Sequence, residues 1–130
     1  MYLTRVLLLD EIEEYFKKAE RKLESSKILY DAGDYSNSLS LSYYAMLLVS
    51  KALLIKIGIT TNKHHGIIKE FGRNYVKTGK FDDTTYKYFT KTQSLRNQCD
   101  YEAIDEINEK IAATKIKEAR EYIDETKKLI

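Results

Sequence analysis

The stretch YSNSLSLSYYAMLLVSKALLIKI, residues 35–57, decides the fold of this chain. Apolar residues dominate positions 43–57, and neither glycine nor proline interrupts them. Such a run is too long for an ordinary strand, so the serine–leucine alternation at residues 38–42 does not indicate one. A helix that is apolar nearly all round is buried among its neighbours. We therefore expect a central helix between an N-cap at Asp34 and Gly58, with small serines that let a neighbouring helix approach closely.

Upstream of this segment the pattern predicts another helix. Asp10 and Glu13 have the spacing of a capping box, with Asp where Ser or Thr is usual. Gly33 stands where a helix terminator is expected. Between these points the apolar residues recur at near-helical spacing, at Ile12, Phe16, Ala19, Leu23 and Ile28. The helix is therefore expected to begin near Asp10 and to end at Gly33.

Two further helices are predicted after the central one. The first follows a loop through Asn62 and ends at Gly79. Its inner positions are Ile67, Ile68, Phe71, Tyr75 and Val76. The second begins at Asp82 or Asp83 and ends near Tyr101. Its inner positions are Tyr86, Phe89 and Leu95.

A last helix, capped by Asn108, completes the pattern. Its inner positions are Ile111, Ala112, Ile116, Ala119, Ile123 and Leu129. The 130 residues include no proline, and short links favour antiparallel neighbours. We predict an all-α antiparallel bundle of about five helices, a single domain over residues 1–130 with its core at about 10–129. One cysteine allows no internal disulfide, and the apolar run in the first ten residues is too short for a membrane span, so a cytoplasmic protein without membrane contact is expected.

Positive charge is concentrated in the middle third of the chain. Residues 62–99 carry eight basic and three acidic side chains, although the formal net charge of the whole chain is only +2. These cations are expected to attract a phosphate-bearing ligand if several converge on one face, whereas scattered ones are ordinary solvated side chains. The basic residues are Lys63, Lys69, Arg73, Lys77, Lys80, Lys87, Lys91 and Arg96.

The segment SLRNQCDY, residues 94–101, contains the candidate ligand-binding residues Arg96, Asn97, Asp100 and Tyr101. On a helix, Arg96 and Asp100 share a face, so the simplest interpretation is an exposed ion pair worth roughly 0.3 to 0.5 kcal/mol. That interpretation leaves the neighbouring amide and phenol unexplained. A guanidinium fork can bind a phosphate through two hydrogen bonds, and the amide and phenol can complete its surroundings.

The two histidines, His64 and His65, are adjacent and therefore point about 100° apart on a helix. They cannot form one metal-binding face together, and we expect neither a metal site nor a cofactor. Either residue can be a simple polar helix start, or an imidazole that accepts or donates a proton near neutral pH. Cys99 has no partner cysteine and is interpreted as a buried or incidental thiol.

Three segments occur in an order that resembles a known family. These are SYYAM followed by SKALL in the central helix, then FGRNYVKTG, and then the pattern R-N-x-x-D-Y at residues 96–101. The chain resembles the HEPN family, the higher eukaryotes and prokaryotes nucleotide-binding domain, and specifically its small stand-alone prokaryotic proteins. The likeness covers roughly residues 12–128.

The resemblance implies a homodimeric helical bundle with the arginine segments near a shared cleft. Many members of the family are metal-independent ribonuclease toxins, often paired with a minimal nucleotidyltransferase as antitoxin. Their motif is an arginine followed, after four to six residues, by a histidine. Here Arg96 and Asn97 match its start, but Tyr101, Glu102 and Ala103 stand at the histidine positions. Ala103 also occupies the place of a tyrosine that is adenylylated in some of these toxins, so neither property carries over directly.

Two classes of function follow. The favoured one is a module that binds a nucleotide or an RNA phosphate through Arg96, Asn97 and Tyr101, with little or no catalysis, beside a nucleotidyltransferase partner. The alternative is a ribonuclease toxin in which Arg96 stabilises the transition state, Tyr101 orients the 2′-hydroxyl or the phosphate, and His64 supplies the missing acid or base. A purely structural helical dimer is a third interpretation.

Overall fold

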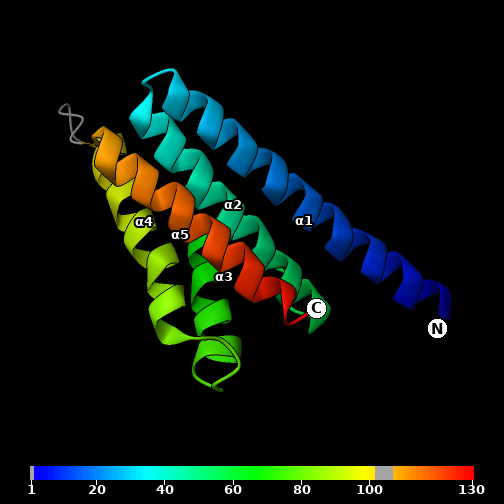
Figure 1. Ribbon diagram of the computed structural model, residues 1–130. Helices are drawn as coiled ribbons and strands as arrows, with labels where there is room; N and C mark the ends of the chain where they lie inside the picture. The colour runs from blue at the N-terminus through cyan, green and yellow to red at the C-terminus, as the bar shows by residue number, and fades with distance from the viewer. Residues whose placement is uncertain (1, 102–106) are drawn as a thin grey trace.

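The protein is a bundle of antiparallel helices (Figure 1). The computed structural model describes residues 2–101 and 107–130, except for the side chains of Tyr2, Asp100 and Tyr101. The elements are α1 (Tyr2–Asp31), α2 (Tyr35–Lys56), α3 (His64–Phe71), a π-helical turn η1 (Gly72–Val76), α4 (Asp83–Tyr101) and α5 (Glu109–Lys127). Every regular element in these ranges is helical, which confirms the predicted all-α bundle of about five helices.

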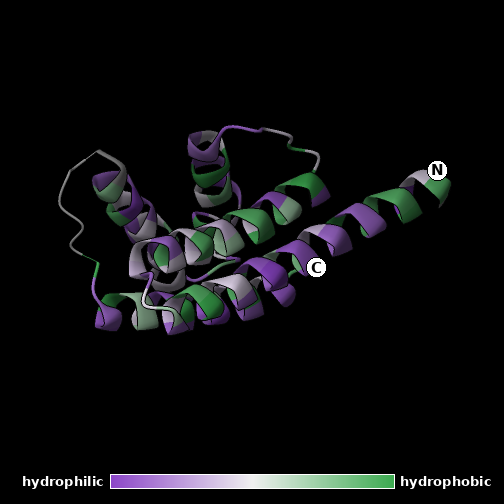
Figure 2. Ribbon diagram, turned by 90° about the horizontal axis from the view of Figure 1, so that it is seen from above, coloured by the Kyte–Doolittle hydropathy of each residue, from purple (hydrophilic) through white to green (hydrophobic). Residues whose placement is uncertain are grey.

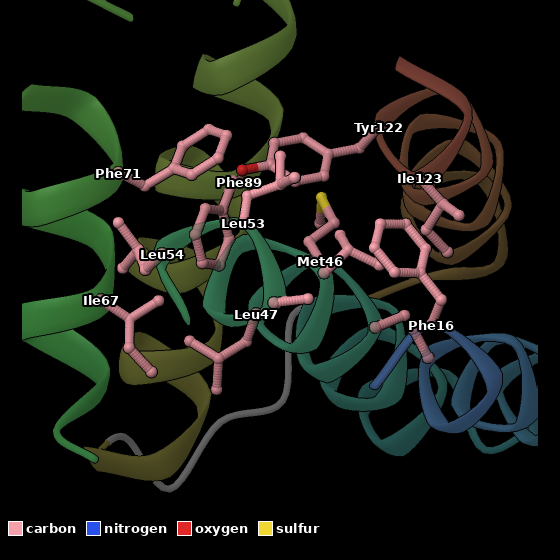
Figure 3. Close-up of a cluster of buried hydrophobic side chains, with 14 of the residues drawn as sticks. Phe16, Met46, Leu47, Leu53, Leu54, Ile67, Phe71, Phe89, Tyr122 and Ile123 are labelled. Carbon is pink, nitrogen blue, oxygen red and sulfur yellow. The ribbon is translucent and has the colours of Figure 1, made fainter. Parts of the chain in front are cut away.

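Helix α2 lies at the centre of the bundle, as its sequence predicts. It contacts α1, α3, α4 and α5. Its length and composition would allow it to cross a membrane, but 72% of its most apolar window is buried inside the bundle. Figure 3 shows Met46 of α2 facing Phe16 and Ile123, while Phe71 and Phe89 point toward Tyr122. Burial of most of its circumference therefore identifies α2 as the core helix, while a stripe through Tyr44, Leu48 and Lys51 is half-buried.

Serine side chains join α1 to α2. The hydroxyl of Ser26 donates a hydrogen bond to the Ser38 carbonyl at 2.6 Å, and the Ser38 hydroxyl donates to the Ser26 carbonyl at 2.8 Å. The Ser42 hydroxyl lies 2.8 Å from that of Ser26. All three residues are completely buried. The small side chains thus let the two helices approach closely, and the hydrogen bonds satisfy polar groups that water cannot reach.

The predicted start of the first helix is wrong. Helix α1 begins at Tyr2, so Asp10 and Glu13 are exposed residues inside it rather than a capping box. Residues 2–9 contain neither glycine nor proline, and nothing in them stops a helix from extending. This part of α1 projects past the rest of the bundle in both Figure 1 and Figure 2. Ile28, expected inside, is 62% exposed because it lies five residues after the buried Leu23 and so faces away from α2.

Most other helix ends agree with the predictions, but the third helix, expected to run to Gly79, ends at Phe71 and is followed by the π-helical turn η1. Gly33, Gly58 and Gly79 have positive φ angles, which suits the turns that follow helices. Asn108 caps α5 by accepting a hydrogen bond from the Ile111 backbone. Asp82 accepts hydrogen bonds from the backbone and the hydroxyl of Thr85 and so caps α4. At Asp34 the cap position is correct but its carboxylate accepts from the Asn37 side chain instead of the helix backbone.

The serine contact between α1 and α2 predicts a position-specific loss of stability. We expect Ser26→Val to lower the free energy of unfolding by about 1 to 3 kcal/mol, because the added methyl groups have no space and the hydrogen bonds are lost. Ser25→Val, at the exposed neighbouring position, should change it by less than about 0.5 kcal/mol. Urea unfolding measures both, and equal effects would contradict the close packing.

Candidate functional site

Arg96 is held between two tyrosines of the central helix. It lies in α4, and its guanidinium carbon is 5.3 Å from the ring centroid of Tyr43 and 5.0 Å from that of Tyr44. Its Nη2 donates a hydrogen bond to the Tyr44 hydroxyl at 3.0 Å. Cation–π contacts of this kind are stronger when the cation is partly removed from water, and Arg96 is half-buried. The rings orient the guanidinium without neutralising its charge.

His64 joins the same two tyrosines from a third helix. It is the first residue of α3, and its ring centroid lies 5.9 Å from that of Tyr43 and 5.5 Å from that of Tyr44. Its Nδ1 is 3.4 Å from the Tyr43 hydroxyl, a long contact whose direction depends on the imidazole tautomer. The ribonuclease alternative requires His64 close to Arg96, and in the structure both contact the same pair of rings. We call Tyr43, Tyr44, His64 and Arg96 the arginine cluster.

Local packing fixes the position of His64. The loop before α3 lies against Gly66, where a Cβ atom would come within 2.7 Å of the Thr61 hydroxyl oxygen. Any larger residue at this position would force the Thr61 side chain to move. Buried Ile67 and Ile68 then anchor the short helix on α2. The first turn of α3 is therefore held close to the tyrosines.

The environment keeps His64 and Tyr43 neutral at physiological pH. Burial, and to a smaller extent the charge of Arg96, lowers the pKa of His64 below its usual 6.5. Burial also raises the pKa of Tyr43 to about 12, against a weaker opposing effect of Arg96. The cluster thus presents one guanidinium, a neutral imidazole and, at Tyr43, a phenol that keeps its proton. Its net positive charge is suited to an anionic ligand.

The other predicted site residues do not join the arginine cluster in the described part of the chain. Asn97 is exposed, and it points about 100° away from Arg96 because it is the next residue on the helix. The side chains of Asp100 and Tyr101 lie outside the described residues, as do Glu102 and Ala103. Cys99 is half-buried beside Leu39.

Sequence reasoning missed the two tyrosines as site residues. They belong to the apolar run that predicts the central helix, and Tyr43 is indeed fully buried in the core. The available signal was their adjacency on a buried helix: side chains 100° apart place one phenol inside and the next at the edge. Tyr44 is the residue at the edge.

A basic hollow of about 270 Å³ adjoins the arginine cluster. Tyr44 and His64 form part of its wall, and Lys18, Lys22 and Lys51 supply positive charge. Two of these lysines belong to α1 and one to α2, so none comes from the basic middle third. Lys51 is positioned by a 3.0 Å hydrogen bond to Asn62 and lies over the ring of Tyr15.

The basic middle third converges only in part. Lys69, Arg73 and Lys77 line a second hollow of about 390 Å³ beside η1. This hollow also contains the carboxylate of Asp83, and Arg73 pairs with Glu70 at 4.0 Å. Its charge is therefore partly compensated, which makes it a weaker candidate for an anion site.

Comparison with known proteins places this geometry in context. A family model described as the HEPN domain matches residues 12–129. Two similar proteins of Methanocaldococcus jannaschii are each named "Putative toxin". The first is 32% identical over 120 residues, which cover 92% of this chain and 82% of the relative. The second is 33% identical over 121 residues, which cover 93% of this chain and 90% of the relative. A UPF0332 protein of Thermotoga maritima is 30% identical over 122 residues, 93% of this chain and 92% of the relative.

The lowered pKa of His64 predicts a specific NMR titration. In a His65→Gln variant the remaining imidazole should titrate with a midpoint below 6.5, and adding Arg96→Met should raise that midpoint because the nearby charge is removed. Arg96→Lys retains the charge and should keep the midpoint lower than Arg96→Met does. Since the unfolded chain binds this proton more tightly, the free energy of unfolding should fall as the pH decreases below about 6.5. An unchanged midpoint in the Arg96→Met variant would contradict the proximity of Arg96 and His64.

Proposed function

The chain belongs to the HEPN domain family, and we propose that it is a module that binds RNA phosphate through the arginine cluster, with little or no catalysis of its own. The observation that carries this proposal is the convergence of Arg96 and His64, from α4 and α3, on Tyr43 and Tyr44 of α2. Arginine suits this role because its planar fork matches the geometry of a phosphate.

The arrangement favours binding over catalysis. Cleavage of RNA by its own 2′-hydroxyl requires a group that accepts the proton of that hydroxyl and another that protonates the leaving 5′-oxygen. Neutral His64 is suited to accept a proton. Tyr43, however, is buried, and its pKa of about 12 makes it a poor donor to a ligand. The cluster therefore offers good charge complementarity and an incomplete acid–base pair.

A second candidate function is metal-independent RNA cleavage. It is favoured by the proximity of His64 to Arg96, because this chain lacks the histidine that the family pattern places after the arginine. In this scheme His64 takes the 2′-hydroxyl proton, the 2′-oxygen forms a bond to phosphorus and the bond to the 5′-oxygen breaks. Arg96 stabilises the charge on the phosphorus oxygens, and the leaving oxygen receives its proton from His64 or from the phenol of Tyr44.

The setting we propose is a cytoplasmic toxin–antitoxin-like pair. Support comes from the family resemblance and from the two relatives named "Putative toxin". The partner would be a minimal nucleotidyltransferase, and the module itself would be a homodimer. Most of α2 is covered by its own bundle, and the stripe that stays accessible carries Tyr44, Leu48 and Lys51. Exposed apolar side chains lie instead at Leu3, Leu7 and Leu9 of α1 and at Ile130.

Phosphate binding by Arg96 predicts a selective loss of affinity. With a labelled 2′-O-methyl RNA, which cannot be cleaved through the 2′-hydroxyl, we expect Arg96→Met to weaken binding about tenfold or more. Arg96→Lys should restore it only in part. Arg73→Met, at an exposed arginine outside the cluster, serves as the matched control. Fluorescence anisotropy measures affinity, and thermal unfolding verifies that each variant is folded. Equal losses of RNA affinity in Arg96→Met and Arg73→Met would contradict the proposal.

The same variants separate binding from cleavage when natural RNA is used. We expect no cleavage by the wild-type protein alone at pH 7. Cleavage that disappears in both Arg96→Met and His64→Gln, and persists in His65→Gln, would replace the binding proposal by the ribonuclease candidate. Cleavage lost only in the arginine variant would exclude His64 as the acid or base.

The dimer proposal predicts a mass of about twice 15.2 kDa by light scattering. Leu3→Ser together with Leu7→Ser should reduce it toward the monomer, because these exposed leucines share one face of α1. A monomeric wild type at micromolar concentration would contradict the dimer. A dimer that survives both substitutions would place the interface on another face.

A further inference from the structure

The basic hollow beside the arginine cluster has the chemistry of a second phosphate site. Lys18, Lys22 and Lys51 surround it, and none of the described residues that line it is acidic. Among the residues that the structure describes, no ion pair involves these three lysines. The nearby acids of α1 are already engaged. Glu13 and Glu14 pair with Lys17, and Glu20 binds Arg120 and Lys127.

The hollow is distinct from the position of Arg96 but continuous with it. Tyr44 and His64 line the hollow, whereas Arg96 contacts Tyr44 and is not among the residues that line it. Tyr44 and Lys51 are seven residues apart on α2, so the two positions are separated by about 10 Å along the helix axis. This separation favours two phosphate groups over a single one shared by Arg96 and Lys51.

The lining suits a nucleotide rather than a simple anion. Leu47, Leu48 and Ile67 form apolar surface below the lysines, and Tyr44 offers an aromatic edge. A positively charged groove with aromatic side chains is the general pattern of proteins that bind single-stranded nucleic acid. Lys51 is already positioned by Asn62 and Tyr15, which lowers the cost of ordering its side chain on binding.

We propose that the hollow formed by Lys18, Lys22 and Lys51 binds the backbone phosphate of the nucleotide next to the one at Arg96. The ligand of this protein is accordingly a single-stranded RNA that runs past Tyr44, not a mononucleotide. This inference rests on the proposed function of the arginine cluster. It adds that the RNA is single-stranded and that it continues from Arg96 past Tyr44 to the three lysines.

The test compares two ligands and two sets of variants. The ligands are a labelled 2′-O-methyl RNA of eight nucleotides and the mononucleotide AMP, used as its competitor. In the first set, called the hollow variant, Lys18, Lys22 and Lys51 are changed together to glutamine. The control changes Lys27, Lys110 and Lys117, three exposed lysines away from the hollow, in the same way. Polyglutamate of matched charge is a second competitor.

Wild type should bind the RNA, and the hollow variant should lose affinity at least tenfold while the control variant does not. The slope of the logarithm of the binding constant against the logarithm of salt concentration should also be less steep in the hollow variant. The slope should change by about 2, because three contacts to a single strand are lost. Competition by AMP should be reduced by Arg96→Met and unchanged by the lysine substitutions.

Each alternative result has a defined meaning. Normal RNA binding by the hollow variant, with loss in Arg96→Met, overturns the second site and leaves the proposed function intact. Failure of wild type to bind RNA, or normal binding by Arg96→Met, overturns the proposed function and with it this inference. Competition by polyglutamate as strong as that by unlabelled RNA overturns the proposal in favour of a surface for an acidic protein.

Discussion

Burial of most of α2 is the constraint on which the rest of the structure depends. Its 22 residues include thirteen buried ones, which cover most of the circumference of the helix and leave a half-buried stripe at Tyr44, Leu48 and Lys51. No single neighbour can cover such a helix, so four helices must pack around it. Each covers one sector, and the sector fixes which residues of that helix face α2. The positions of His64 and Arg96 follow from this arrangement, because α3 and α4 meet α2 where Tyr43 and Tyr44 lie.

The arginine cluster illustrates how a core helix can also build a site. Tyr43 is fully buried and packs against Phe89, so it belongs to the core as much as to the cluster. Tyr44, one residue later, reaches the edge of the bundle and contacts both Arg96 and His64. Aromatic rings hold the guanidinium by attraction to their faces, and this attraction does not remove its charge. The basic hollow extends this positive region from the cluster toward α1.

The sequence predicted the fold well because the signals were local. The length of the apolar run identified α2, glycines identified three helix ends, and Asn108 identified the start of α5. The start of α1 was mispredicted, since a favourable cap at Asp10 does not end a helix that has no breaker before it. The site was predicted in fragments. Arg96 and His64 were each named as candidates, but their proximity depends on how α3 and α4 pack, and no spacing in the chain encodes it.

By itself the sequence determined that this protein is an all-α bundle with a buried central helix and an unusual arginine segment. Hydrophobic periodicity and cap residues act over a few positions, and a reader of the chain can follow them directly. Only the tertiary structure decided that an imidazole of α3 stands beside a guanidinium of α4, and that lysines of α1 and α2 share one hollow. His64 and Arg96 are 32 residues apart, and Lys51 is 29 or more residues from Lys18 and Lys22. Their meeting is set by the packing of side chains in the core, which fixes the helices in space.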